Sequence, residues 1–335
     1  MARILEQFDG VSGGYSYPDG AIPTKVTHFK HRCKPSEVTL SNKMVIESAC
    51  VQCSNASCME IPINNDVFDS LKMSQTDLLC PTNSIAYKDK EIYIDSNCIK
   101  CGLCISACPV GAIFFNENND VEIRKADENF TLQNEKLTFD TQTIDVIHEQ
   151  PSESEDAIRQ IISNIQSLTS KGPIMNKLVV KSFESIGFST YITRSGDVNL
   201  RMDALSKEDD IYYPIEIEIS ANLDAPRDIL DDVAVFCSRQ NVSKDNVIGI
   251  IVLGEIPNKR TEYWELISDI ESVTGVKIAT IPIAALLTCV WNKKPINVRD
   301  YFLGKGRTSV RSAINQSLGR EINVSPNSNL LEAVK

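Results

Sequence analysis

Four cysteines between positions 98 and 108 constrain this chain more than any other feature. Cys98, Cys101, Cys104 and Cys108 follow the spacing C-x2-C-x2-C-x3-C, and a proline comes directly after the last of them. Three thiolates within seven residues can enclose one small inorganic core only if the backbone curls tightly around it. Gly102 allows such a close approach because it has no Cβ. The motif therefore predicts a loop that wraps around a metal cluster.

A second group of cysteines precedes this motif and repeats its logic with insertions. Cys50, Cys53 and Cys58 are spaced C-x2-C-x4-C, and 21 residues separate Cys58 from Cys80, which Pro81 follows. Nine of the 11 cysteines lie between positions 33 and 108. The N-terminal residues show no secretory signal pattern, so we expect these thiols to be reduced and to bind metal rather than to form disulfides.

The two motifs resemble those of bacterial two-cluster ferredoxins over about residues 44–124. The resemblance implies an α+β ferredoxin-like dicluster domain that binds two [4Fe–4S] clusters with crossed ligation. One cluster is then expected on Cys80, Cys98, Cys101 and Cys104, and the other on Cys50, Cys53, Cys58 and Cys108. The insertions in the first motif depart from the family pattern and leave a three-iron cluster open there. A tetrahedral zinc site is a further alternative.

The remaining cysteines and a short histidine motif carry weaker signals. His28, His31 and Cys33 are irregularly spaced, and we interpret them as surface residues of an irregular arm rather than as a metal site. Cys237 and Cys289 fall on the apolar faces of predicted helices, which favours buried, unreactive thiols.

The pattern of the chain changes along its length and predicts five segments. They are an irregular extension at 1–43, the dicluster domain at 44–124, an acidic linker at 125–152, an α/β domain at 153–292 and a basic tail at 293–335. Within the α/β domain, a capped helix from about 153, a helix at 176–185 and strands at 189–193, 200–205 and 212–220 are expected. Helices at 227–240, 261–274 and 283–291 alternate with strands at 247–253 and 276–280, which indicates a mixed or parallel sheet covered by helices.

Two glutamates on one predicted strand are the candidate site of this second domain. Glu216 and Glu218 are two residues apart, so they share one face of the strand, while Ile215 and Ile217 lie on the other. Asp203 ends the preceding predicted strand and would complete a set of hard oxygen ligands suited to Mg²⁺ or Mn²⁺. The plainer interpretation is a half-buried strand with an outward charged face. Asp197, in a predicted turn, is a rival for the role of Asp203.

This order of elements resembles the PD-(D/E)XK nuclease superfamily, in particular Mrr-like restriction endonucleases, over about residues 174–292. The resemblance implies a restriction-endonuclease-like fold and metal-dependent phosphodiester hydrolysis. Asp203 matches the family's aspartate, Glu216 its D/E position and Glu184 an accessory acid. Glu218 stands where lysine is usual, and Arg227 could supply the missing cation. The predicted catalytic set is therefore Asp203, Glu216, Glu218 and Glu184.

Charge narrows the partners that the chain can bind. The net charge is −11, whereas residues 293–335 carry +5, so DNA contact is expected only through the C-terminal domain and its basic tail. The basic residues of that tail include Lys293, Lys294, Arg299, Lys305, Arg307, Arg311 and Arg320. No apolar run is long enough to span a bilayer, and a cytoplasmic location is expected.

Two functions from different classes follow from these patterns. The first is an iron–sulfur protein whose C-terminal domain is a DNA endonuclease under redox or structural control by the clusters. The second is an electron-transfer ferredoxin that acts on a redox partner protein, with a C-terminal domain that serves as a non-catalytic docking or regulatory module.

Overall fold

The fold was obtained as a computed structural model, which describes residues 58–62, 76–88, 91–108, 111–123, 154–168, 174–193, 200–220 and 222–334. The chain divides into two compact units, residues 1–151 and 152–335. The expected boundary between linker and α/β domain, at 152–153, lies next to this division. None of the described helices is both long and apolar enough to cross a lipid bilayer.

The described part of the first unit consists of three small antiparallel pairs and one short helix. Strand β1 (Glu60–Pro62) pairs with β2 (Thr76–Leu78), β3 (Ile85–Lys88) with β4 (Glu91–Ile94), and β5 (Ile113–Phe115) with β6 (Val121–Ile123). Helix α4 (Leu103–Ala107) lies between the second and third pairs in the chain. Strands β3, β4 and β5 coincide with short apolar runs of the sequence.

The β3–β4 pair, the β5–β6 pair and helix α4 share one small hydrophobic core. Ile85 and Ile92 from one hairpin and Ile113 and Val121 from the other are buried together with Ile105 of α4. Cys58 and Cys108 belong to the same buried cluster, and Cys80, Cys98 and Cys104 pack against it. The core of the first unit is therefore built partly from cysteine side chains.

The second unit is built on a mixed five-stranded sheet in the order β11-β10-β9-β8-β7. Strands β7 (Ser189–Ile192), β8 (Ala204–Glu208) and β9 (Ile211–Glu218) form an antiparallel meander. Strands β10 (Ile248–Leu253) and β11 (Lys277–Pro282) continue the sheet in parallel with β9. All six residues of β10 are buried, as its continuous apolar run predicts for a strand covered on both faces.

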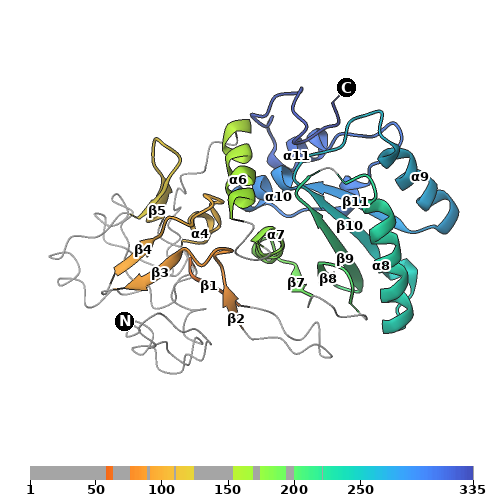
Figure 1. Ribbon diagram of the computed structural model, residues 1–335, viewed down its shortest axis with the longest axis horizontal. Coiled ribbons are helices and arrows are strands. Elements are labelled where there is room, and N and C mark those ends of the chain that lie inside the picture. Colours follow the sequence, from red (N-terminus) through yellow and green to blue (C-terminus); the bar gives the residue numbers. More distant parts are fainter. Residues whose placement is uncertain are drawn as a thin grey trace. The chain divides into compact units, whose positions relative to one another are not determined.

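Helices cover both faces of this sheet (Figure 1). Helices α8 (Ala225–Gln240) and α9 (Glu262–Thr274) pack on one face, against β9, β10 and β11. Helices α7 (Ile174–Ser185) and α10 (Ile283–Trp291) contact each other and the sheet on the opposite face. Helix α6 (Glu155–Ser167) begins at the expected cap, because Ser154 Oγ accepts a hydrogen bond of 3.2 Å from the Ala157 amide. The expected mixed sheet covered by helices is confirmed.

One predicted strand of this unit is displaced along the chain. The expected strand at 200–205 is observed as β8 at Ala204–Glu208. The apolar residues Leu200 and Met202 predict a strand that begins at position 200. Both are buried, but they precede β8. Asp209, with φ 51°, and Asp210 form the tight turn into β9, so the hairpin fixes where β8 ends.

The predicted basic tail is not a tail in the structure. Residues 293–334 include a 3₁₀ turn, η5 (Val298–Tyr301), and helix α11 (Arg311–Leu318), and they belong to the second unit. Val310, Ile314, Leu330 and Leu331 are fully buried. The high proportion of basic and polar residues concealed this apolar set, which is spaced too irregularly to show a helical or strand period.

A single glycine sets how closely two of the parallel strands approach at their carboxyl ends. Gly254 follows β10, and its amide donates a 2.8 Å hydrogen bond to the carbonyl of Glu218. A Cβ at this position would lie 2.1 Å from the carbonyl oxygen of Ile219. Only glycine therefore fits where the chain leaves the sheet beside Glu218.

Candidate functional site

Cys80 and Cys108, each of which precedes a proline in the sequence, accept matching backbone hydrogen bonds. The amide of Ser84 donates to Cys80 Sγ at 3.2 Å, and the amide of Ala112 donates to Cys108 Sγ at 3.3 Å. Each turn has a residue in the left-handed region three positions after the cysteine, Asn83 with φ 55° and Gly111 with φ 65°. Each then leads directly into a strand, β3 or β5. The repeat seen in the sequence is therefore also a repeat of backbone and sulfur geometry.

Electrostatic repulsion links Cys80 to the thiols of Cys98, Cys101 and Cys104 in the second motif. Cys98 Sγ accepts a 3.4 Å hydrogen bond from the Lys100 amide, and Cys101 accepts one from the amide of Leu103. Gly102, with φ 75°, precedes α4 and lets the backbone curl there, as the sequence predicts. Such amide donors stabilise negative charge on sulfur in iron–sulfur sites.

The electrostatics of this group call for a compensating positive charge. Burial, followed by the repulsion of neighbouring thiols, raises the pKa of Cys101 and Cys104 well above the ordinary value of 9.0. Burial also raises the pKa of Cys98, and Cys80 is among the groups that repel each of these three thiolates. Thiolates that repel one another in buried or partly buried positions are costly alone, whereas iron would lower that cost by direct coordination.

These neighbours form the quartet that crossed ligation would use for one cluster. Both quartets remain predictions, and Cys50 and Cys53 of the second lie outside the described residues. Its other members, Cys58 and Cys108, are both buried in the shared core, and Cys58 also repels the Cys104 thiolate. His28, His31 and Cys33 likewise lie outside the described residues. Of the remaining two cysteines, Cys289 is fully buried as expected, whereas Cys237 is half-buried.

The second unit brings Asp203 directly beside the two glutamates of β9. Asp203 immediately precedes β8, and its Oδ2 accepts a 3.0 Å hydrogen bond from the amide of Ile217, which lies between Glu216 and Glu218 in the chain. Its Oδ1 accepts a 2.9 Å hydrogen bond from Asn176 Nδ2 on α7. Burial raises the pKa of Asp203 despite these two donors. The strand and the preceding turn thus fix the aspartate among the predicted acidic residues.

Glu216 faces helix α8 rather than open solvent. Its side chain is half-buried, and burial raises its pKa to about 8, with further contributions from Asp203, Asp232, Glu218 and Asp228. Asp232 is 6% exposed, and burial raises its pKa to about 6 although the Arg201 guanidinium acts in the opposite direction. The outward charged face that the plainer interpretation predicted is therefore covered at Glu216 by a helix that adds more negative charge.

The other predicted members of this site have different surroundings. Glu184 forms an ion pair of 3.0 Å with Lys181 on the same helix, α7. Glu218 accepts a 2.6 Å hydrogen bond from Asn222. Arg227, the proposed source of a cation, is exposed and pairs with Asp224 and Glu262. Asp197 lies outside the described residues.

The described ranges contain no preformed site for a single metal ion. Within them, no three His, Cys, Asp or Glu side chains converge closely enough to hold one metal ion. In the second unit the carboxylates repel one another, and Asp203 is turned toward Ile217 and Asn176. A cation there would need Glu216 and Glu218 to move closer to Asp203.

Comparison with known proteins identifies the first unit. Residues 91–114, which include Cys98, Cys101, Cys104 and Cys108, match the family described as 4Fe-4S binding domain. Two uncharacterized ferredoxins of Methanocaldococcus jannaschii are 39% identical over 66 residues and 33% identical over 73 residues, or 19% and 22% of this chain. A relative described as ferredoxin 7Fe, from Hydrogenibacillus schlegelii, is 31% identical over 74 residues, which are 22% of this chain and 72% of that protein.

The chain belongs to the ferredoxin family. The similarity supports binding of a 4Fe–4S cluster by the second cysteine motif, in preference to the zinc alternative. This ferredoxin spans about a third of the length of the two M. jannaschii relatives, 32% and 33%. The 4Fe-4S match at 91–114 lies in the first unit.

Sequence reasoning missed several residues that the structure of this ferredoxin places at the carboxylate site. Asn176 gave no signal, because an amide at the start of a helix is common. Asp228 and Asp232 did give one, since acidic residues four positions apart on a helix share one face. That helix follows the strand of Glu216 and Glu218, so a parallel crossover lays it back onto the sheet.

The raised pKa of Glu216 predicts how stability depends on pH in this ferredoxin without divalent metal. A carboxyl whose pKa rises on folding from 4.5 to about 8 stabilises the fold fully below 4.5, and that contribution is lost as the pH rises through 8. We expect Glu216→Gln to raise the melting temperature by about 2–4 °C above pH 8 and to leave it unchanged below pH 4.5. Thermal unfolding of the full chain in chelator, followed across this pH range, measures the difference.

A matched control for this measurement is Glu271→Gln. Glu271 lies on α9 and is exposed, with an ion pair to Lys277. Its replacement should change the melting temperature little at any pH. Equal behaviour of the two variants would contradict the buried, uncompensated charge at Glu216.

Proposed function

We propose that this ferredoxin binds two iron–sulfur clusters and passes single electrons to a redox partner. The observation that carries the proposal is the grouping of Cys80 with Cys98, Cys101 and Cys104, a set that draws on both motifs as crossed ligation requires. Cys108 repeats the turn of Cys80, which supports an equivalent role toward a second cluster on Cys50, Cys53 and Cys58. The bound clusters would supply the one-electron chemistry, and the acidic chain would attract a basic partner.

The cluster of the first cysteine motif could contain either four irons or three. The longer spacing between Cys53 and Cys58 and the insertion before Cys80 separate the first motif from the second. The name of the H. schlegelii relative counts seven irons, which agrees with one four-iron and one three-iron cluster. Either version keeps the four-iron cluster on the quartet that contains Cys101.

Anaerobic purification followed by iron and acid-labile sulfide analysis tests this proposal. Two cubanes give about eight irons and eight sulfides per chain, whereas a three-iron cluster in the first motif gives about seven irons. Electron paramagnetic resonance of the oxidised and reduced protein separates the two versions, because an oxidised three-iron cluster is paramagnetic. A colourless protein without labile sulfide, or one that holds only zinc, would reject the proposal.

We also propose that the second unit is a restriction-endonuclease-like domain that cleaves DNA with Mg²⁺ or Mn²⁺. The supporting observation is the position of Asp203, whose carboxylate accepts a hydrogen bond from the amide between Glu216 and Glu218 on β9, the central strand of a mixed sheet. A divalent ion bound to these carboxylates would activate water and stabilise charge on the attacked phosphate. Asp203, Glu216 and Glu218 would hold it, and Asp232 would be an additional acid. Glu184, the proposed accessory acid, forms an ion pair with Lys181.

The alternative for this unit is a docking or regulatory module without catalysis. The absence of lysine at Glu218 and the need for the carboxylates to move together favour it. DNA cleavage assays with Mg²⁺ and Mn²⁺ distinguish the two proposals, and the decisive variant is Glu216→Gln, discussed below.

A further inference from the structure

The segment once expected as a basic tail forms the wall of a surface pocket. The pocket has a volume of about 500 Å³ and lies between the loop after β10 and the C-terminal residues. It is lined by Lys259, Gly306, Arg307, Thr308, Ser309 and Glu332. Two cations, two hydroxyl groups and a glycine without a side chain therefore surround one hollow.

Backbone hydrogen bonds hold three separate segments together around this pocket. Val310 donates to the carbonyl of Leu331 at 2.9 Å, and Ala333 donates to the carbonyl of Thr308 at 2.8 Å. Lys259 donates to the carbonyl of Val334 at 3.0 Å, which ties the loop after β10 to the same wall. Gly304 and Arg307 exchange two hydrogen bonds of 3.0 Å in a tight turn. The pocket is thus preorganised by main-chain pairing.

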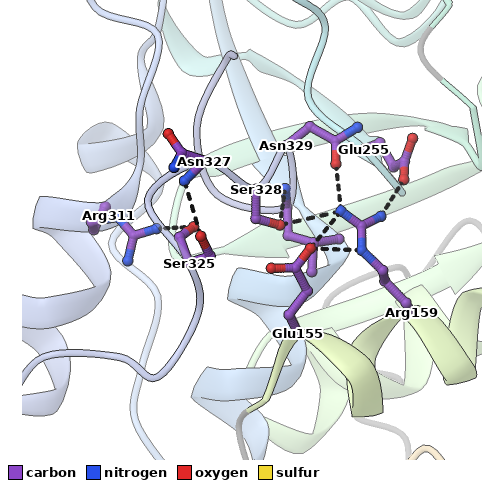
Figure 2. Close-up of polar contacts among 9 residues, drawn as sticks. Glu155, Arg159, Glu255, Arg311, Ser325, Asn327, Ser328 and Asn329 are labelled. Carbon is purple, nitrogen blue, oxygen red and sulfur yellow. Dashed lines mark hydrogen bonds and ion pairs between the residues drawn. The ribbon is translucent and has the colours of Figure 1, made fainter.

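Two partly buried guanidinium groups strengthen this frame by their hydrogen bonds (Figure 2). Arg311 donates to the carbonyls of Val324 and Ser325 at 2.8 Å each, and Arg159 on α6 donates to Ser328 and Asn329 at 3.3 and 2.9 Å. Both arginines therefore secure the chain segment that leads to the pocket wall, and they are engaged in structure rather than offered to a ligand.

The charges that remain at the pocket are positive. Arg311 forms an ion pair of 2.9 Å with Glu332, which neutralises the one acidic side chain of the lining. Within the described part of the chain, neither Lys259 nor Arg307 forms a salt bridge, and the guanidinium of Arg307 donates to the uncharged carbonyl of Asp300 at 2.6 Å. Lys305, by contrast, is paired with Glu265 at 3.2 Å. Two uncompensated cations facing one hollow are notable in a chain of net charge −11.

We propose that this pocket binds a phosphate group, with Lys259 and Arg307 contacting its oxygens and the hydroxyl groups of Thr308 and Ser309 donating to it. A guanidinium and an ammonium group are the side chains best suited to phosphate, and neutral hydroxyl donors commonly complete such sites. The loop of Lys259 leaves the sheet at the carboxyl end of β10, the same edge at which Glu218 ends β9. The proposal extends the proposed nuclease function. It rests on that function only for the source of the phosphate, which would be a DNA backbone rather than a small phosphate.

Binding measurements on the full chain in chelator test this site without cleavage. A fluorescent DNA duplex and inorganic phosphate are the two probes, and wild type is compared with the double variant Lys259→Ala/Arg307→Ala. We expect DNA binding to weaken about tenfold or more and the dependence of log affinity on log salt to fall by about one to two. Lys305→Ala removes an equally exposed but paired cation and should change affinity less than about twofold.

Each outcome decides the proposal. DNA binding that depends on the two residues supports the site with nucleic acid as its source, whether or not Mg²⁺ supports cleavage. Phosphate binding that depends on them, without DNA binding, supports the site with a small phosphate as its source. Failure of the wild type to bind either probe, or equal binding by the folded double variant, overturns it. Circular dichroism and thermal unfolding confirm that the variants are folded.

Discussion

Replacement of Cys101 by serine is expected to remove one of the two proposed iron–sulfur clusters and to leave the other in place. Cys101 is 7% exposed and is grouped with Cys80, Cys98 and Cys104. Each of these three would already hold an iron of the same cluster, so none of them can replace the lost thiolate. A serine hydroxyl is a poor ligand for iron of a cluster bound through thiolates. Iron and labile sulfide per chain should therefore fall by about half relative to wild type.

The control for this experiment is Cys237→Ser, which removes a half-buried thiol from helix α8 of the second unit. It should retain the full iron content and the visible absorbance of wild type. The reduced Cys101→Ser protein should show a simpler paramagnetic spectrum, because coupling between two clusters is lost. Unchanged iron content in Cys101→Ser would exclude the proposed quartet.

Glu216→Gln is expected to abolish metal-dependent cleavage of DNA, while above pH 8 and without divalent metal it makes the second unit more stable. The substitution removes a negative charge that Asp203, Asp232 and Glu218 oppose, which is why stability rises. The same charge is the one that would hold a divalent cation, so we expect cleavage to fall by about a hundredfold or more. A residue that costs stability but supplies activity is characteristic of a functional site.

Gel-based cleavage of plasmid DNA with Mg²⁺ or Mn²⁺ measures this second effect. Glu271→Gln, an exposed glutamate on α9, serves as the matched control and should cleave like wild type. Wild-type protein that cleaves no DNA with either metal would favour the docking module. Equal cleavage by wild type and Glu216→Gln would place the catalytic residues elsewhere.

The cysteine sites were largely predictable because their geometry is local. The spacing of Cys98, Cys101 and Cys104 and the glycine at 102 determine the loop without help from the rest of the fold. The parallel between Cys80 and Cys108 is also visible in the sequence, since a proline follows each and an isoleucine lies five positions on. What the spacing could not give is the backbone turn with its amide donors, because that depends on left-handed residues at 83 and 111.

The second unit was predictable in its elements and less so in its side-chain partners. Continuous apolar runs placed β10 and α10 correctly, because a buried segment has no polar face to confuse the period. The neighbours of Glu216 depend on which face α8 covers, and that is a long-range property of the sheet order. The folded character of residues 293–334 was missed because its structure comes from main-chain pairing with distant segments, such as Val310 with Leu331.

Because cysteines form part of the core of the first unit, we expect its folding to depend on available iron and sulfide as well as on its sequence. Within the described residues, two of the nine buried members of this core are cysteines, Cys58 and Cys108. A core of this size gives a small domain little stability of its own. We therefore expect the supply of inorganic iron and sulfide to enter the folding of this unit, and a cell starved of either to accumulate a chain whose first unit is less stable.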